Sequence, residues 1–199
     1  MSFIMYLAPL GAVMVLLCSD LGFAQEQVQN TDNPPAQAQA PGVRSTRFDD
    51  WYLRCVDVKD TGDRTVQQCE VAQVAQVQQG EGTIDVLTLA IAKVAPEAGK
   101  NAATDDFLLT ALVPLNVVLP IGLVLAADDK DLGTTPYRNC NEVGCWAQKK
   151  LDQKTVAALQ KGAAGQARLR LMNGKNINLK FSLKGLSRAL AELQKPSKA

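Results

Sequence analysis

Histidine is missing from the 199-residue sequence, and aromatic residues make up only 5% of it. Histidine is the side chain most often used as a general base, and it is also the commonest metal ligand. Without it, neither a Ser-His-Asp nor a Cys-His catalytic arrangement can form, and zinc sites that combine cysteine with histidine are excluded. A glycine-rich loop of either common phosphate-binding form is also absent. We therefore predict that the protein is not an enzyme and has no catalytic residue, no metal site and no cofactor.

Carboxylates are the remaining candidates for catalysis. They are adjacent in the sequence at Asp49-Asp50, at Asp105-Asp106, and at Asp128-Asp129 with Asp131. Neighbouring residues of a strand point to opposite faces, and acids in loops are usually solvated turn residues. Residues 129–133 have a weak similarity to a calcium loop, but the glycine spacing and the distant glutamate of an EF-hand are absent. We interpret all three groups as turn residues.

The N-terminal region has no Lys or Arg, and residues 3–18 are uncharged and mostly apolar. The small residues Gly22 and Ala24 follow at the spacing that a signal peptidase reads. We predict that residues 1–24 are a signal peptide cleaved after Ala24. An uncleaved anchor is the alternative, because the positive charge typical of a signal peptide is missing. We expect the exported protein in the periplasm, in the cell envelope or in the medium.

Residues 25–46 are rich in Gln, Ala and Pro and contain almost no large apolar side chain. Such a segment cannot bury enough surface to offset the entropy lost when it becomes ordered, so we predict a flexible tether. Residues 47–195 remain, which is a length typical of one domain with a hydrophobic core.

Four cysteines follow the predicted export signal. In an exported protein an even set of cysteines indicates disulfides, and four cysteines allow three pairings. Proximity in the sequence favours Cys55 with Cys69 and Cys140 with Cys145. Neither pair has the Cys-x-x-Cys spacing of a thioredoxin-like redox site, so we predict two structural disulfides.

Charge is missing from residues 107–127, and this run is long enough to span a bilayer as a helix. Pro114, Pro120 and Gly122 argue against a helix, because each proline would remove a helical hydrogen bond. We predict that the prolines divide the run into short buried strands. No stable membrane span is then expected after signal cleavage, and a transmembrane helix is the alternative.

The rest of the chain has many short strand patterns. Alternating or β-branched residues predict strands at 47–58, 66–77 and 83–94. Asn173-Gly174, between predicted strands 167–172 and 175–183, indicates a hairpin with a type I′ turn, in which both central residues have positive φ. Two short helices are predicted: residues 151–161, with Asp152 as N-cap and Gly162 after the end, and a C-terminal helix with the apolar stripe Leu183, Leu186, Leu190 and Leu193. This pattern predicts an all-β sandwich with short helices.

The charge distribution is asymmetric. Residues 149–199 contain 12 Lys and Arg against two acids, a balance of +10, whereas residues 1–148 have a balance of −9. Two interpretations stay open: a surface that binds lipopolysaccharide, anionic lipid or host polyanions, or the solvent-facing side of the last hairpin and helix. Nucleic acid is not an expected partner of an exported chain. Trp51 and Trp146, each near a cysteine, are expected to pack in the core.

Several short motifs follow one another in a fixed order: Phe48-Asp49-Asp50-Trp51-x-x-x-Cys55, Cys69-Glu70, Leu119-Pro120-x-Gly122, and Cys140-x-x-x-Gly144-Cys145-x-Ala147. In this order and spacing the chain resembles the bacterial invasion-associated locus B family over nearly the whole predicted domain. The closing segment 181–193 is similar to the terminal element of that family. Asp49 and Leu186 depart from the family pattern, where glycine and an aromatic residue are common.

The resemblance implies an immunoglobulin-like β-sandwich, export to the periplasm or cell envelope, and a role named for bacterial entry into host cells; it supplies no catalytic residue. We therefore expect an exported, non-enzymatic envelope or cell-surface protein that contributes to host-cell interaction or entry. The alternative is a periplasmic envelope-integrity or stress factor that binds a small or anionic ligand. The expected partner is accordingly an envelope component or a host-cell surface.

Overall fold

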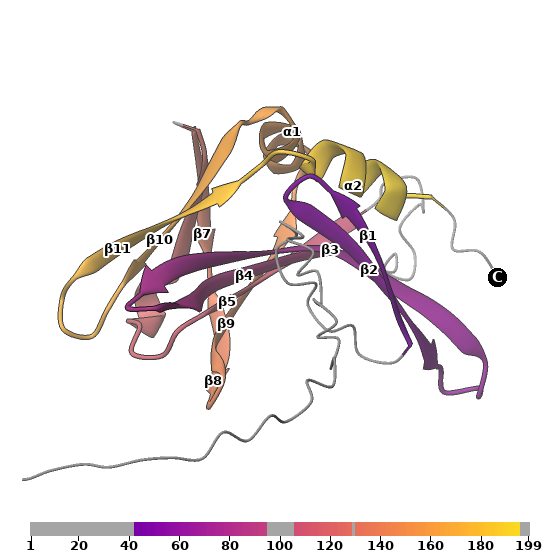
Figure 1. The fold of residues 1–199 in the computed structure, drawn as a ribbon, viewed down its shortest axis with the longest axis horizontal. Helices are drawn as coiled ribbons and strands as arrows, with labels where there is room; N and C mark the ends of the chain where they lie inside the picture. Colours follow the sequence, from indigo (N-terminus) through magenta and orange to yellow (C-terminus); the bar gives the residue numbers. More distant parts are fainter. Residues whose placement is uncertain (1–41, 95–105, 129, 196–199) are drawn as a thin grey trace, which may run out of the picture. The chain divides into compact units, whose positions relative to one another are not determined.

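The computed structural model describes residues 42–94, 106–128 and 130–195, and Figure 1 shows their arrangement. The predicted signal peptide, most of the predicted tether, Asp105 and Asp129 lie outside the described residues. The described part consists of two antiparallel β-sheets with seven and four strands, together with short helices. An all-β sandwich with a C-terminal helix is therefore confirmed.

The seven-stranded sheet begins as a meander, because its first five strands are neighbours both in sequence and in space. Its order is β1-β2-β3-β4-β5-β9-β8. Strand β3 is the longest, and its register with β4 shifts between Ala75 and Gln76. The strands are β1 (Val43–Phe48), β2 (Trp51–Lys59), β3 (Thr65–Gln79), β4 (Gly82–Val94), β5 (Asp106–Val113), β8 (Tyr137–Asn141) and β9 (Gly144–Leu151).

The four-stranded sheet is built from the middle and the end of the described chain. Its order is β11-β10-β6-β7. The strands are β6 (Leu123–Ala127), β7 (Lys130–Thr135), β10 (Ala164–Arg170) and β11 (Asn176–Ser182). Strands β10 and β11 alternate between buried apolar and exposed polar residues, which is the pattern of strands with one face on a core.

The core lies between the inner faces of the two sheets. Leu89 and Ile91 of the larger sheet and Ala167 and Leu169 of the smaller sheet belong to one buried cluster. Trp51 is also buried, and its Nε1 donates a hydrogen bond to the carbonyl oxygen of Ser182 at 2.9 Å, which connects the sheets. The expectation that Trp51 packs in the core is thus confirmed, whereas Trp146 is only half-buried.

Two α-helices lie at one end of the sandwich, at the top of Figure 1. Helix α1 (Gln153–Lys161) begins after Asp152, whose side chain accepts a hydrogen bond from the Thr155 amide, and Gly162 follows its end, as predicted. Helix α2 (Leu186–Leu193) buries the predicted leucine stripe. It contacts strands β2 and β3 as well as α1, so it closes this end of the core.

The uncharged run 107–127 forms strands, as predicted. It contains most of β5, the short 3₁₀ helix η1 (Leu119–Ile121) and β6. Pro114 follows the last residue of β5, and Pro120 lies in η1. Among the residues that the structure describes, no helix is both long enough and apolar enough to span a membrane.

The turn between β10 and β11 differs from the predicted type I′ turn. Gly174 has positive φ (84°), but Asn173 does not. The Gly174 amide donates to the Leu171 carbonyl oxygen at 2.9 Å, and the Leu171 amide donates to the Lys175 carbonyl oxygen at 2.8 Å. These bonds define a three-residue loop with a glycine bulge, which needs only one residue with positive φ. The hairpin was correctly predicted; the turn type was wrong.

Strand β1 begins at Val43, inside the segment 25–46 that the sequence suggested as a tether. Its residues pair in register with β2, from Val43 opposite Val56 to Phe48 opposite Trp51. Main-chain pairing holds this strand on the sheet edge, and Phe48 at its end packs against the core. Arg44 adds an exposed ion pair with Asp57 at 2.7 Å.

Candidate ligand-binding pocket

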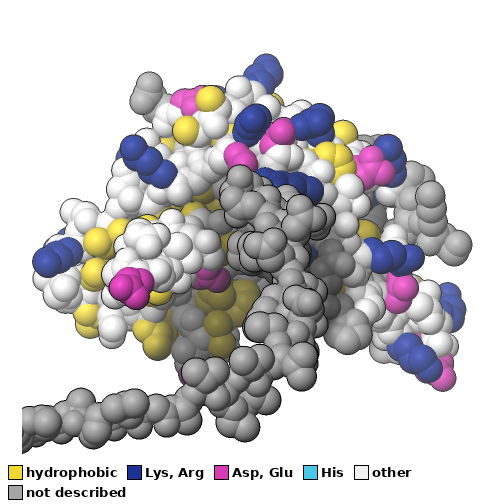
Figure 2. Space-filling view, in the orientation of Figure 1, with side chains coloured by type: hydrophobic (Ala, Val, Ile, Leu, Met, Phe, Trp, Pro, Cys, Tyr) yellow, Lys and Arg dark blue, Asp and Glu magenta, His cyan; other side chains and the backbone are white. Residues whose placement is uncertain are grey.

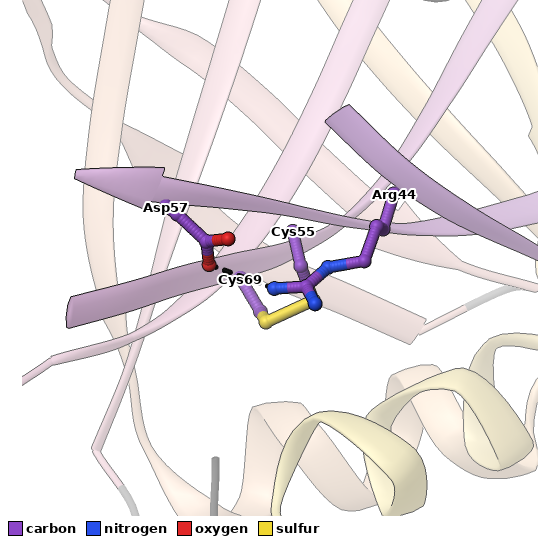
Figure 3. Close-up of a disulfide and its surroundings, with 4 residues drawn as sticks. All are labelled: Arg44, Cys55, Asp57 and Cys69. Atoms are coloured by element: carbon purple, nitrogen blue, oxygen red, sulfur yellow. Dashed lines mark hydrogen bonds and ion pairs between the residues drawn. A yellow bond between two sulfur atoms is a disulfide. The ribbon is translucent and has the colours of Figure 1, made fainter. Parts of the chain in front are cut away.

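Both predicted disulfides are present, and each joins residues that lie opposite one another on neighbouring strands. Cys55 of β2 is bonded to Cys69 of β3, and Cys140 of β8 is bonded to Cys145 of β9. Figure 3 shows the first bond beside the Arg44–Asp57 ion pair. Both disulfides connect strands within the larger sheet. The bonded pairs are close in sequence, as predicted.

The described acids that were considered for catalysis lie apart in the fold: Asp49, Asp50 and Asp128 are turn residues, Asp106 begins β5, and Asp131 lies in β7. Asp49 has positive φ (51°) and pairs with Arg188 of α2. Asp128 also has positive φ (49°), and its side chain accepts hydrogen bonds from the amides of Ala163 and Ala164. Asp49 and Asp128 each have structural partners of their own, so the structure does not bring these two carboxylates together.

Asp131 has the same kind of role. Its side chain accepts a hydrogen bond from the Gly133 amide at 2.6 Å and pairs with Arg168 of β10 at 2.9 Å. Within residues 42–94, 106–128 and 130–195, no group of three or more His, Cys, Asp or Glu side chains could hold a metal ion.

The basic C-terminal region is distributed over the outer side of the molecule. Arg168, Arg170 and Lys180 are exposed on the outer face of the β10–β11 hairpin, where they alternate with buried residues. Arg188 and Lys195, in and after α2, pair with Asp49 and Glu192. This placement favours the solvent-facing interpretation over a dedicated basic binding surface.

A pocket of about 460 Å³ lies at the end of the sandwich opposite the helices. Three segments converge there: the β3–β4 hairpin, the connection after β5, and the β10–β11 hairpin, all at the left of Figure 1. The lining is aliphatic except for two asparagines. Its residues are Val86, Pro114, Leu115, Asn116, Val117, Leu169, Leu171, Met172, Asn173, Ile177 and Leu179.

The connection after β5 forms one wall of the pocket because it crosses from the larger sheet to the smaller one. Pro114 has no amide hydrogen and cannot continue the ladder of β5. Val117 then pairs with Leu171 in an isolated bridge. The Val118 amide donates to the Arg170 carbonyl oxygen at 2.8 Å, and the Met172 amide donates to the Asn116 carbonyl oxygen at the same distance. These bonds fix the wall against the β10–β11 hairpin.

Apolar side chains remain exposed at this end. Leu115 and Met172, which line the pocket, are 42% and 71% exposed. Val77 and Ile84 lie opposite one another near the tip of the β3–β4 hairpin and are 42% and 43% exposed. Figure 2 shows hydrophobic side chains at the left-hand end of the molecule, where the hairpin tips lie. Exposed apolar side chains around a cavity are typical of a binding site.

The pocket is suited to binding rather than to acid–base chemistry. Its volume lies within the usual range of small-molecule sites. None of the lining side chains titrates, and the side-chain oxygen of Asn173 already accepts a hydrogen bond from the Lys175 amide. Burial raises the pKa of Tyr137 to about 12, but Tyr137 does not line the pocket. The arrangement can therefore enclose an apolar group but offers no general acid or base to it.

No local pattern in the sequence indicated this pocket. The residues that line the pocket come from segments far apart in the chain, and most of them have sequence patterns typical of ordinary strands or turns. One available signal was Leu115, an apolar residue directly after Pro114 at a predicted break between strands. Another was Met172, an apolar residue at the edge of a predicted hairpin turn.

The comparisons with known proteins agree with this fold. Residues 51–194 match the family model described as "Invasion associated locus B (IalB) protein". The chain belongs to the IalB family. A crystal structure of invasion associated protein B from Bartonella henselae is similar, with a TM-score of 0.61 and 19% sequence identity over 75% of this chain and 94% of that chain. At this level of sequence identity, the similarity to the Bartonella protein shows the fold alone. A search of curated proteins finds no match.

Proposed function

We propose that this IalB family protein is exported and acts in the cell envelope by binding a ligand in the pocket between its two sheets, without catalysing a reaction. The observation that carries the proposal is the pocket itself, a cavity of about 460 Å³ at the open end of the sandwich, with exposed apolar residues at its rim. The lining contains no nucleophile and no titratable group, which favours binding over catalysis.

Export is supported by the two disulfides. Disulfides persist in oxidising compartments such as the periplasm and are rare in the cytosol. Cys55–Cys69 and Cys140–Cys145 are both formed in the structure. The predicted signal peptide at residues 1–24, with cleavage after Ala24, supplies the route. Residues 25–46 are proposed to act in part as a tether, up to the start of β1.

Two roles for such a binding protein differ in where it acts. A contribution to host-cell interaction or entry is favoured by the name of the structural neighbour, invasion associated protein B. A periplasmic envelope-integrity or stress role is favoured by a pocket sized for a small molecule rather than for a large receptor surface. The first role requires the domain outside the outer membrane, and the second role requires it inside.

Protease accessibility separates the two roles. The native protein carrying an epitope tag is exposed to protease in intact cells and in cells whose outer membrane has been opened. Cleavage in intact cells supports host-cell interaction, and protection until opening supports the envelope role. Protection even after opening, with the tag recovered in the cytosol, would contradict export and with it the proposed function.

Complementation tests whether the pocket matters. A deletion strain receives the wild-type gene, Leu115→Asp or Val143→Asp, and both host entry and detergent resistance are measured. Leu115 lines the pocket, whereas Val143 is 66% exposed at the β8–β9 turn and does not. We expect Val143→Asp to restore the lost phenotype and Leu115→Asp to fail. Full restoration by both variants would contradict a function that depends on the pocket.

A further inference from the structure

We propose that the pocket binds the hydrocarbon chain of a single-chain anionic amphiphile, such as a free fatty acid, with the acidic head group next to Lys175 at the rim. This inference rests on the proposed function, because it names the ligand class of the same pocket. Three features carry it: the chemistry of the lining, the continuation of the apolar surface past the rim, and the position of one lysine.

The lining favours an aliphatic chain over other small ligands. Apart from two asparagines, the described residues that line it are valine, leucine, isoleucine, methionine and proline, with no aromatic and no charged side chain among them. Nucleotides and sugars are usually held by stacking on aromatic rings and by several polar contacts, which Asn116 and Asn173 alone would not supply. Branched aliphatic side chains and a flexible methionine adapt to a hydrocarbon chain.

The apolar surface continues outward from the pocket. Val77 and Ile84 pair across β3 and β4, and about two fifths of each residue is exposed. Alternation along β3 places Val77 on the same face as the buried Val71, which is the inner face of the sheet. A chain too long for the cavity would therefore still cover apolar surface on its way out.

Lys175 occupies the next inner-face position after the pocket. The Leu171 amide donates to the Lys175 carbonyl oxygen, so Lys175 lies opposite Leu171, which lines the pocket. Lys175 directly precedes β11, and extending the alternation of that strand back by one residue places it on the same face as Ile177 and Leu179, two further lining residues. Lys175 is exposed, and among the ion pairs of the described residues it has no carboxylate partner. A cation beside an apolar pocket matches a ligand with an apolar chain and an acidic head.

Lys180 provides a matched control on the same hairpin. It is exposed, but it lies between the buried residues Leu179 and Phe181 and therefore on the outer face of β11. A lysine-to-glutamine substitution at either position removes one positive charge from the same hairpin. Only the substitution at position 175 removes it from the pocket rim.

The test is a binding titration by calorimetry with the exported protein, purified from cells and freed of bound lipid. Dodecanoate and dodecanol have the same chain and differ in the charge of the head group. We expect the wild type to bind dodecanoate about fivefold more tightly than dodecanol, the size of an exposed ion pair. Lys175→Gln should lose this preference, and Lys180→Gln should keep it. High salt should weaken the preference in the wild type.

The chain-length dependence tests the pocket directly. Binding of octanoate, decanoate and dodecanoate should become tighter by up to about fourfold per added methylene while the chain fills the cavity. Leu115→Asp should reduce the affinity for all three, and Val143→Asp should not. Circular dichroism and thermal unfolding of each variant show whether the fold is intact.

Three outcomes would overturn the inference. No binding of any of these amphiphiles would do so, as would equal affinity for the acid and the alcohol in the wild type. Sedimentation with phosphatidylglycerol vesicles in the absence of dodecanoate binding would replace the pocket ligand with a membrane surface. If Leu115→Asp still fails to restore the deletion phenotype in any of these cases, the proposed pocket function stands with another ligand, so the two failures are distinguishable.

Discussion

The two ends of the sandwich have the same apolar inner faces but differ in what covers them. At one end α2 lies over strands β2 and β3, and its residues Leu186 and Leu190 are completely buried. At the other end the connection after β5 and two hairpins surround a cavity, with Leu115 and Met172 exposed at its rim. Apolar side chains contribute to stability at the closed end, whereas the open end leaves part of its apolar surface available to a ligand.

Polar contacts show the same difference. At the closed end Gln73 is buried, its Nε2 donates to the Asp50 carbonyl oxygen at 2.8 Å, and its Oε1 accepts from the Ser182 amide at 2.9 Å. Together with the hydrogen bond from Trp51 to Ser182, these contacts connect the two sheets. At the open end the polar side chains among the described residues that line the pocket are Asn116 and Asn173. Polar contacts thus connect the two sheets at the closed end, whereas the open end contains the cavity.

Alanine substitutions should show the largest difference between the two ends, measured as the loss in the free energy of unfolding. Leu190→Ala removes a fully buried side chain of α2 and should lower the free energy of unfolding by about 2 to 5 kcal/mol. Met172→Ala removes a side chain that is 71% exposed and should change the free energy of unfolding by less than about 0.5 kcal/mol. Urea denaturation of both variants measures the difference. Equal losses would show that the open end is as important for stability as the closed end.

The disulfides should affect stability but not the pocket, because neither contains a lining residue. Replacing Cys55 and Cys69 together by alanine removes a bond that closes 14 residues and should cost about 3 kcal/mol. The corresponding change at Cys140 and Cys145 removes a bond over five residues and should cost about 2 kcal/mol. Denaturant unfolding measures both costs.

Ligand titration of the same cysteine variants completes this comparison. The folded variants should keep the affinity for dodecanoate, because neither disulfide includes a lining residue. A loss of affinity in a variant that remains folded would show that the larger sheet transmits strain to the open end.

The closed end was largely predictable from the sequence, because its signals are local. The leucine stripe 183–193 determines which face of α2 is buried, and Asp152 with Gly162 marks the limits of α1. The two disulfides follow from proximity in the sequence, and Pro114 and Pro120 correctly indicated strands rather than a membrane helix. In each of these cases the residues that carry the information lie within about 15 positions of one another.

The open end was not predictable, because its geometry depends on contacts between distant segments. Val117 reaches Leu171 across 54 positions, and no local pattern indicates this bridge. The register shift between Ala75 and Gln76 sets the position of Ile84, and it has no clear signal in the sequence either. The Asn173-Gly174 pair gave the hairpin but not the turn type, because hydrogen bonds to Lys175 and Leu171 selected a bulged loop.

Acidification should produce the smallest effect, and of the two ends compared it should act on the closed end. The hydrogen bond from the Thr155 amide lowers the pKa of Asp152 below its ordinary value of 3.8, because the bond favours the charged carboxylate at the start of α1. The stabilisation is therefore present above the pKa of the unfolded chain and is lost as the pH falls through the lower folded pKa.

Hydrogen exchange of the α1 amides measures this loss, and Asp152→Asn serves as the control, because its cap does not titrate. The amides of Val118 and Met172 should keep their protection over the same range, since no lining side chain of the pocket titrates. Equal loss of protection at both ends would mean that acid acts on the whole sandwich rather than on the cap of α1.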